Sequence, residues 1–161
     1  MARQTPRRRS VLYVEDDEND VFFMQDAFRE VGITEPLQVV RDGQEAIDYL
    51  AGTAPFEDRE RYPLPCVVLL DLQLPRKDGL VVLDWIRSQS SLRGLIVIMF
   101  SSSAHPRDID RAYELGVNSF VVKPVSVQKR MEITKLLKDW WLGCNEFASI
   151  YEGCATWNAE V

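Results

Sequence analysis

The sequence has few of the residues on which disulfide-bonded and zinc-binding proteins depend. Its 161 residues include one histidine, His105, and three cysteines, Cys66, Cys144 and Cys154. The cysteines are odd in number and show no close metal-ligand spacing, so we expect neither a disulfide framework nor a zinc site. A single histidine cannot form a metal cluster, and His105 is expected to lie in a loop.

Long apolar runs and an excess of positive charge are also missing. No run approaches the roughly 20 apolar residues that span a bilayer, and Val11–Val14 is too short for the apolar part of a signal peptide. We therefore expect a cytoplasmic protein with no membrane partner. The net charge of −6 argues against a protein that mainly coats nucleic acid. The Arg7–Arg9 run is interpreted as a solvated terminus in preference to a nucleic-acid contact, so no direct DNA binding is expected.

Short apolar runs alternate with segments of helical pattern along the chain. Because 46% of the residues are hydrophobic, the chain can bury the core of one ordinary domain. The third and fourth runs are continuously apolar, and the alternation predicts a doubly wound α/β domain with a parallel sheet. The predicted strands are Val11–Val14, Leu37–Val40, Cys66–Leu70, Leu95–Phe100 and Phe120–Val122. The predicted helices are Asp20–Val31, Gln44–Leu50, Leu80–Arg87, Asp108–Leu115 and Ser126–Leu142, of which the first, second, fourth and fifth are ended by Gly32, Gly52, Gly116 and Gly143.

Chemically active side chains follow four of the predicted strands. Glu15 and Asp16 come after the first, Asp71 after the third, Ser101 after the fourth and Lys123 after the fifth. In an open α/β sheet the ligand site lies at the carboxyl ends of the strands, so we expect these side chains to converge. Three neighbouring carboxylates repel one another unless a hard cation such as Mg²⁺ binds them. With the lysine and the serine they form a phosphoryl-binding arrangement in which Asp71 is the candidate nucleophile.

Each of these residues taken alone has an ordinary structural explanation. An aspartate at a strand end commonly caps a turn or a helix. Lys123 alone would be a surface charge, and Ser101 would start a turn. Capping does not account for polar groups at the ends of four separate strands, so the combination favours a site.

Three segments resemble the signatures of the bacterial two-component response regulator receiver domain, the CheY-like family. They are Val11–Asp17, Leu69–Gly79 and Phe120–Pro124, and the likeness extends over residues 10–142. The pattern Leu-Asp-Leu-x-Leu-Pro-x-x-Asp-Gly and the segment Ala112–Gly116 are most similar to stand-alone regulators paired with phytochrome-type histidine kinases.

The resemblance implies a flavodoxin-like (βα)5 fold with strand order 2-1-3-4-5. It also implies that Asp71 accepts a phosphoryl group from a kinase phosphohistidine. Asp16, Asp71 and the backbone carbonyl of Gln73 would bind Mg²⁺, and Glu15 would assist through water. Such a protein is no enzyme beyond its own phosphotransfer and autodephosphorylation.

A conformational switch is a further implication of the resemblance. Lys123 would contact the phosphoryl group, and its bond to Pro124 is expected to be cis. The Ser101 hydroxyl would move toward the phosphoryl group and let Phe120 turn inward, which shifts an existing equilibrium. Receivers often have tyrosine at the Phe120 position. Because phenylalanine has no hydroxyl, switching here would rely on packing.

We divide the chain into a flexible basic arm at residues 1–9, the receiver domain at 10–143 and a short extension at 144–161 with no output domain. The signal would therefore leave through a protein surface. The resemblance suggests a homodimer through the fourth and fifth predicted helices and the fifth strand. The cognate partner would be a sensor histidine kinase, with a bacteriophytochrome as one candidate.

Aromatic residues near the end of the chain suggest where surfaces meet. Trp140 and Trp141 cannot both point inward from one helix, so one is expected near the rim of the fold or in an interface. The extension is expected to pack back on the domain or to cover a dimer surface. Its large apolar residues are Phe147, Ile150, Tyr151 and Trp157.

Other functions stay open at this point. An aspartyl-phosphate phosphatase would use the same nucleophile, but Gln73 stands where its second aspartate belongs. A serine hydrolase would need a Gly-x-Ser-x-Gly turn, which Ser101–Ser103 lacks, and a partner for His105. A phosphorylation-independent adaptor or dimer scaffold is not excluded by any residue. The unpatterned stretch Thr53–Pro65 is interpreted as a solvated loop, with a partner-binding loop as the alternative.

Overall fold

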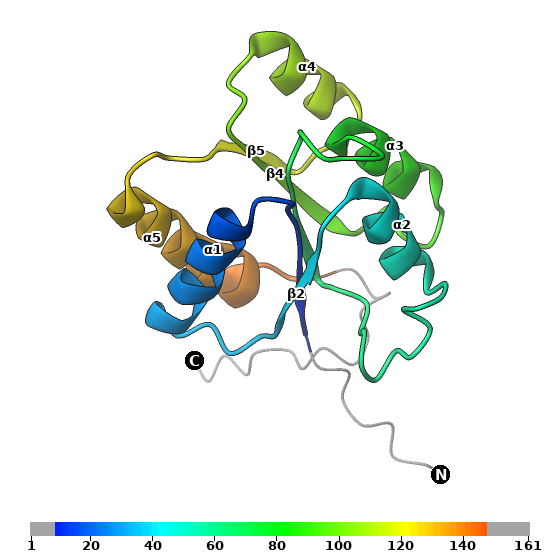
Figure 1. Ribbon diagram of the computed structural model, residues 1–161, viewed down its shortest axis with the longest axis horizontal. Helices are drawn as coiled ribbons and strands as arrows, with labels where there is room; N and C mark the ends of the chain where they lie inside the picture. Colours follow the sequence, from blue (N-terminus) through cyan, green and yellow to red (C-terminus); the bar gives the residue numbers. More distant parts are fainter. Residues whose placement is uncertain (1–8, 148–161) are drawn as a thin grey trace.

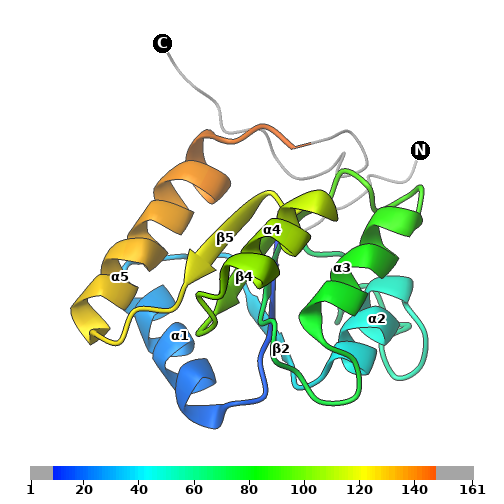
Figure 2. The ribbon, with the colours of Figure 1, turned by 90° about the horizontal axis from the view of Figure 1, so that it is seen from above.

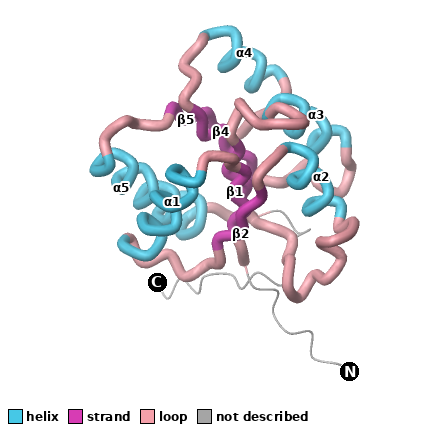
Figure 3. The backbone as a smooth tube through the Cα atoms, viewed as in Figure 1, coloured by secondary structure: helices cyan, strands magenta, loops and turns pink. Residues whose placement is uncertain are grey.

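In the computed structural model, which describes residues 9–147, five parallel strands form one sheet (Figure 1). They are β1 (Val11–Val14), β2 (Leu37–Val40), β3 (Val67–Leu70), β4 (Ile96–Ser101) and β5 (Ser119–Val122). Their order across the sheet is β2-β1-β3-β4-β5, which confirms the expected flavodoxin-like topology. All five point the same way, so their carboxyl ends meet at one edge, and Figure 3 shows the strands as a single layer between helices.

Helices cover both faces of this sheet (Figures 1 and 2). On one face α1 (Glu18–Glu30) packs against α5 (Val127–Leu136). The other face carries α2 (Gly43–Ala51), α3 (Gly79–Ser88) and α4 (Pro106–Glu114). No helix within residues 9–147 is both long and apolar enough to pass through a bilayer.

Alternate residues of the central strands face the two helical layers, which explains why these strands are apolar throughout. In β1, Leu12 and Val14 are buried in the core that α2 and α3 cover. Val11 and Tyr13 are buried in the core that α1 covers. Burying a large apolar side chain contributes roughly 1.5–3 kcal/mol. The strand is therefore held firmly from both sides, and the acidic residues that follow it start from a fixed position.

Polar side chains cap the helices at their N-termini. The Asp17 carboxylate accepts hydrogen bonds from two backbone amides in the first turn of α1, the closer at 2.8 Å, so this helix begins two residues before its predicted start. His105 lies just before α4, and its Nδ1 accepts a hydrogen bond from the Arg107 amide at 3.2 Å. The remaining caps are Asp42 for α2, Asp78 for α3 and Ser126 for α5.

The helix predicted at Ser126–Leu142 consists of two elements. After α5 the chain continues as a π-helical segment, η1 (Leu137–Cys144), in which the Asn145 amide donates to the Trp140 carbonyl at 2.8 Å. The expected stop at Gly143 is wrong, because the wider π-helical turn carries the chain past the glycine. Trp141 packs against the core, while Trp140 is 61% exposed, which confirms that one of the two lies at the rim.

The stretch Thr53–Pro65 was predicted to be a solvated loop, but several of its side chains contact α2. Arg59 donates from Nη1 to the Tyr49 carbonyl at 2.8 Å and from Nη2 to the Leu50 carbonyl at 2.9 Å, so it binds carbonyls in the last turn of α2. The rings of Tyr49, Phe56 and Tyr62 contact one another. These contacts fix the loop against the edge of the domain.

The first and last described residues meet. Arg9 donates from Nη1 to the Leu142 carbonyl at 3.2 Å, and its guanidinium lies 5.3 Å from the centre of the Phe147 ring. Phe147 packs against the buried cores, so this part of the extension does pack back on the domain. The predictions for the arm at residues 1–8 and for Ile150, Tyr151 and Trp157 fall outside the described residues.

A substitution at Gly79 can test how tightly the loop after β3 is packed. A Cβ at this position would lie 2.2 Å from the Asp71 carbonyl oxygen and 2.9 Å from Leu72 Cα. We expect Gly79→Ala to lower the free energy of unfolding by about 2–4 kcal/mol in urea denaturation, because the backbone must move. Gly143→Ala, where the nearest atom is Lys138 O at 3.2 Å, should cost less than about 1 kcal/mol. Equal losses in the two variants would contradict this packing.

Candidate functional site

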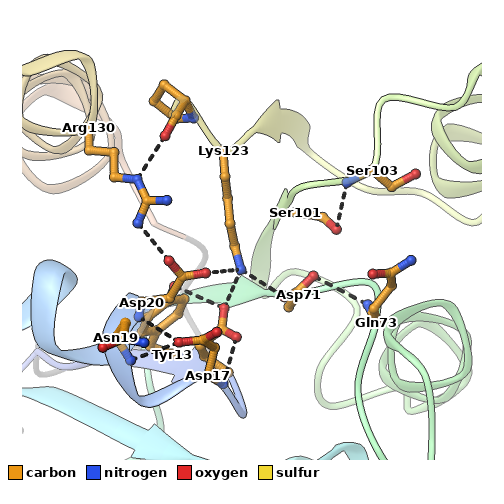
Figure 4. A network of polar contacts seen from close by, with 12 residues as sticks. Tyr13, Asp17, Asn19, Asp20, Asp71, Gln73, Ser101, Ser103, Lys123 and Arg130 are labelled. Carbon is orange, nitrogen blue, oxygen red and sulfur yellow. Dashed lines mark hydrogen bonds and ion pairs between the residues drawn. The ribbon is translucent and has the colours of Figure 1, made fainter. Parts of the chain in front are cut away.

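A buried lysine at the carboxyl edge of the sheet binds three carboxylates (Figure 4). The Lys123 side chain is only 2% exposed. Its amine donates to Asp71 Oδ2 at 2.7 Å, to Asp20 Oδ2 at 2.9 Å and to Glu15 Oε2. An ammonium group has three hydrogens, so each carboxylate accepts one of them. The positive charge is thereby fully paired in a place that water hardly reaches.

Backbone hydrogen bonds that continue past the strand ends hold these residues in place. The Glu15 amide donates to the Val40 carbonyl at 3.0 Å, and the Asp71 amide donates to the Val14 carbonyl at 3.1 Å. The Lys123 amide donates to the Ser101 carbonyl at 2.8 Å. Each side chain therefore starts from a backbone that is part of the sheet. This is the placement expected from parallel strands whose ends share one edge.

Three acidic side chains lie close enough to share a cation. Carboxylate oxygens of Glu15, Asp16 and Asp71 are all within 4.8 Å of one another. Glu15 and Asp71 are buried, whereas Asp16 is exposed, so the group opens toward solvent on one side. Hard oxygen ligands of this kind suit Mg²⁺, which keeps several waters when it binds to proteins. The donor set fits the metal that the sequence implies. Gln73 donates its backbone amide to Asp71 Oδ1 at 3.2 Å, and its carbonyl stays a predicted ligand.

Burial and the mixed charges shift the pKa values of the paired groups. Burial alone would lower the pKa of Lys123, but its hydrogen bonds to the three carboxylates outweigh burial and hold the pKa above its ordinary value. The amine is therefore protonated at neutral pH. Burial raises the pKa of Glu15, and its bonds to Lys123 only partly oppose this effect. Glu15 thus takes up a proton more readily than an exposed glutamate does.

The hydroxyl and the aromatic side chain of the predicted switch lie on β4 and β5. Ser101 is buried, and its Oγ accepts a hydrogen bond from the Ser103 amide at 3.4 Å. Ser103 in turn donates to Asp108 of α4 at 2.7 Å, which attaches the loop after β4 to the helix. Phe120 is half-buried and packs against the core under α2 and α3. Movement of either residue stays a prediction.

The cis bond expected between Lys123 and Pro124 is not found. The cis peptide bond within the described part of the chain joins Ala54 to Pro55, and the Lys123–Pro124 bond is trans. Trans is the favoured isomer of most bonds that precede proline. In this conformation the amine of Lys123 already reaches Asp71, and the Pro124 carbonyl accepts a hydrogen bond from Arg130 Nε at 2.8 Å.

Three residues that contact the site, Tyr13, Asp20 and Arg130, were not predicted from the sequence to belong to it. Tyr13 donates its hydroxyl to Glu15 Oε2 at 3.1 Å, and Asp20 accepts from Arg130 Nη1 at 2.6 Å through the oxygen that does not bind Lys123. Burial alone would raise the pKa of Asp20, but the hydrogen bonds to Lys123 and Arg130 hold it below its ordinary value. Asp20 lies in the first turn of α1, four residues after Asp16, and this closeness in the chain could have placed it near the site. Nothing in the sequence links Arg130 to it.

The chain matches a known protein family over most of its length. A model of the response regulator receiver domain matches residues 11–150. The chain belongs to this family. Receiver domains are phosphoacceptor signalling proteins of two-component systems, and they bind Mg²⁺ at an acidic pocket. The acidic group of Glu15, Asp16 and Asp71 occupies the corresponding edge of this receiver.

Individual relatives agree with the family match. The probable methanogenesis regulatory protein FilR2 of Methanothrix harundinacea is 36% identical over 84% of either chain. The structure of the phosphorylated cyanobacterial phytochrome response regulator RcpA is 31% identical, with a TM-score of 0.82 over 88% of this receiver and 99% of that chain. The Mn²⁺-bound form of response regulator Rcp1, a protein of Synechocystis, is 28% identical, with a TM-score of 0.79 over 87% and 99% of the two chains.

Removal of one carboxylate should separate charge repulsion from metal binding. Without metal, we expect Asp16→Asn to raise the free energy of unfolding by about 1 kcal/mol, because fewer like charges face one another. Mg²⁺ at 100 times its dissociation constant should stabilise the wild type by about 2.7 kcal/mol and the variant much less. The measurement is thermal unfolding with and without Mg²⁺.

Glu18→Gln is the matched control. Like Asp16, Glu18 is acidic and exposed, and it lies two residues further along, in the first turn of α1. This variant should respond to Mg²⁺ as the wild type does. Equal stabilisation of wild type and Asp16→Asn by Mg²⁺ would place the metal elsewhere.

Proposed function

We propose that this receiver is a single-domain response regulator that accepts a phosphoryl group from a sensor histidine kinase on Asp71. The observation that carries the proposal is the position of the Asp71 carboxylate. It directly follows the central strand β3, its side chain is 9% exposed, and it contacts the Lys123 ammonium and shares an acidic group with Glu15 and Asp16. A carboxylate so placed can react with phosphorus while the charges around it neutralise the transferred group.

Phosphotransfer from a phosphohistidine balances simply. A carboxylate oxygen of Asp71 attacks phosphorus, an O–P bond forms, and the P–N bond to the imidazole breaks with its electron pair left on nitrogen. The Lys123 ammonium remains protonated and stabilises the negative oxygens that were on the donor. Bound Mg²⁺ would supply further positive charge for those oxygens.

In the proposal Asp16, Asp71 and the Gln73 carbonyl hold the metal, and Glu15 assists. The Ser101 hydroxyl then binds the phosphoryl group, and Phe120 turns inward to change the surface around α4 and β5. Support comes from the attachment of the β4–α4 loop through Ser103, which links the site to that helix. In the same proposal, the receiver domain comprises residues 10–143. The protein catalyses only its own phosphotransfer and autodephosphorylation, and it is located in the cytoplasm.

A phytochrome-type kinase is the partner that the relatives favour. RcpA is a cyanobacterial phytochrome response regulator, and the present chain aligns with 99% of its length. We propose a cognate kinase of this class, such as a bacteriophytochrome, and output through protein contact with no direct DNA binding.

The output surface is proposed to be a homodimer interface on α4, β5 and α5. β5 is an edge strand, and an edge strand leaves backbone groups unpaired unless something covers it. Large apolar side chains of these elements and of η1 are exposed. They are Tyr113, Val122, Val127, Leu136 and Trp140. A symmetric contact would bury them together.

A phosphatase would turn over the aspartyl phosphate with an acid two residues after the nucleophile. Gln73 occupies that position, and the side-chain amide of glutamine cannot serve as a general acid. The phosphoacceptor function is therefore preferred.

Phosphoryl labelling tests the function. With Mg²⁺ and a small phosphodonor, we expect one acid-stable, base-labile phosphoryl group per wild-type chain by mass spectrometry, and none on Asp71→Asn. Asp78→Asn is the control, because asparagine caps α3 as well as aspartate does. It should be labelled like the wild type. An unlabelled wild type, or labelling that survives in Asp71→Asn, would refute the proposal, and sustained phosphoester hydrolysis would favour the phosphatase.

Two valines of similar exposure test the dimer. Val122 on β5 is 41% exposed and Val81 on α3 is 45% exposed. In light scattering across a concentration series, we expect Val122→Glu to weaken dimerisation at least about tenfold, or 1.4 kcal/mol, because it buries a charge in the interface. Val81→Glu should leave the dimer unchanged. A monomeric wild type with and without phosphodonor would argue against this interface.

A further inference from the structure

Arg130 of α5 joins three parts of the molecule next to Lys123. Its Nε donates to the Pro124 carbonyl at 2.8 Å, and its Nη1 donates to Asp20 Oδ1 at 2.6 Å. The guanidinium also lies 5.5 Å from the centre of the Phe23 ring, which covers it from α1. The planar guanidinium group is therefore held by two hydrogen bonds, which Figure 4 shows, and by the Phe23 ring on one face.

These contacts close a ring around the lysine. Asp20 binds the Lys123 amine with one oxygen and Arg130 with the other. Arg130 in turn binds the carbonyl of Pro124, the residue that follows Lys123 in the chain. One end of the lysine side chain is thus held at the backbone and the other at the amine, through the same two partners. The Asp20 and Arg130 side chains are only 17% and 22% exposed, so water weakens these bonds little.

Asp20 differs from the two other carboxylates that bind the amine. Glu15 and Asp71 also belong to the acidic group that would hold the metal, and Asp71 would carry the phosphoryl group. Asp20 lies outside that acidic group. When Glu15 and Asp71 share their charge with a cation, Asp20 is the carboxylate left to hold the ammonium group in place.

We propose that Asp20 and Arg130 are positioning residues, which hold the Lys123 ammonium directed at the oxygen of Asp71 where the phosphoryl group is received. This proposal rests on the proposed phosphoacceptor function. Without the pair, the ammonium would lose one of three anchors and sample orientations that do not neutralise the transferred oxygens. The effect should therefore fall on the chemical step and leave phosphodonor binding unchanged.

Single-turnover labelling separates positioning from a purely structural ion pair between α1 and α5. At saturating Mg²⁺ the dependence on phosphodonor concentration gives a maximal rate constant and a half-saturating concentration. We expect Asp20→Asn and Arg130→Gln each to lower the maximal rate about tenfold, with half-saturation changed less than about twofold. Because the two residues act as one unit, the double variant should be no slower than the slower single variant.

Asp26→Asn is the matched control on the same helix. Asp26 is paired with Arg29 at 3.0 Å on the exposed side of α1, so this variant removes the same charge from the same element. It should phosphorylate at the wild-type rate. A wild-type rate in Asp20→Asn, an equal loss in Asp26→Asn, or losses that multiply in the double variant would overturn the positioning role. An unlabelled wild type would overturn the phosphoacceptor function and the positioning role together.

A second measurement needs no phosphoryl transfer. In ¹⁵N-labelled protein, the buried Lys123 ammonium should give a slowly exchanging signal that is absent from Lys123→Met. We expect hydrogen exchange of this signal to be at least about fivefold faster in Asp20→Asn and unchanged in Asp26→Asn, since protection requires the third hydrogen bond. Equal exchange in wild type and Asp20→Asn would contradict the proposal even if labelling were lost for another reason.

Discussion

The arrangement depends on one buried positive charge, the Lys123 ammonium, whose three hydrogens bind three carboxylates. A charge with this little exposure would be costly unless every hydrogen bond were made. The partners come from the end of β1, the end of β3 and the first turn of α1. The parallel sheet brings those segments and the end of β5 to one edge, so the lysine's pairing depends on the fold.

The same pairing leaves the site with more negative than positive charge. Asp16 adds a further carboxylate to the group around Lys123, and Arg130 compensates only at its edge. Sites that bind cations or accept phosphoryl groups commonly have such an excess of negative charge, at some cost in stability. Here the uncompensated side is the exposed one, at Asp16, where a metal ion and a phosphodonor can approach.

Sequence patterns predicted the parts of the structure that depend on local periodicity and on the rule for strand ends. The five strands and the convergence of Glu15, Asp71 and Lys123 follow from these, whereas the order of the strands was expected from the family resemblance alone. Arg130 could not be predicted, because its contact with Asp20 depends on how α5 packs against α1. The continuation of α5 as η1 was not predicted, because a glycine does not by itself end a helix. The bond before Pro124 was expected to be cis and is trans, because a family resemblance does not determine the isomer of a single peptide bond.

The most direct test of this account is a crystal structure with Mg²⁺ and beryllofluoride, a stable mimic of a phosphoryl group. The account predicts beryllium bonded to a carboxylate oxygen of Asp71, Mg²⁺ beside Asp16 and Asp71, and the Lys123 amine on a fluoride while it still binds Asp20. A beryllofluoride group bonded to another residue, or a Lys123 amine turned away from Asp71, would contradict the account.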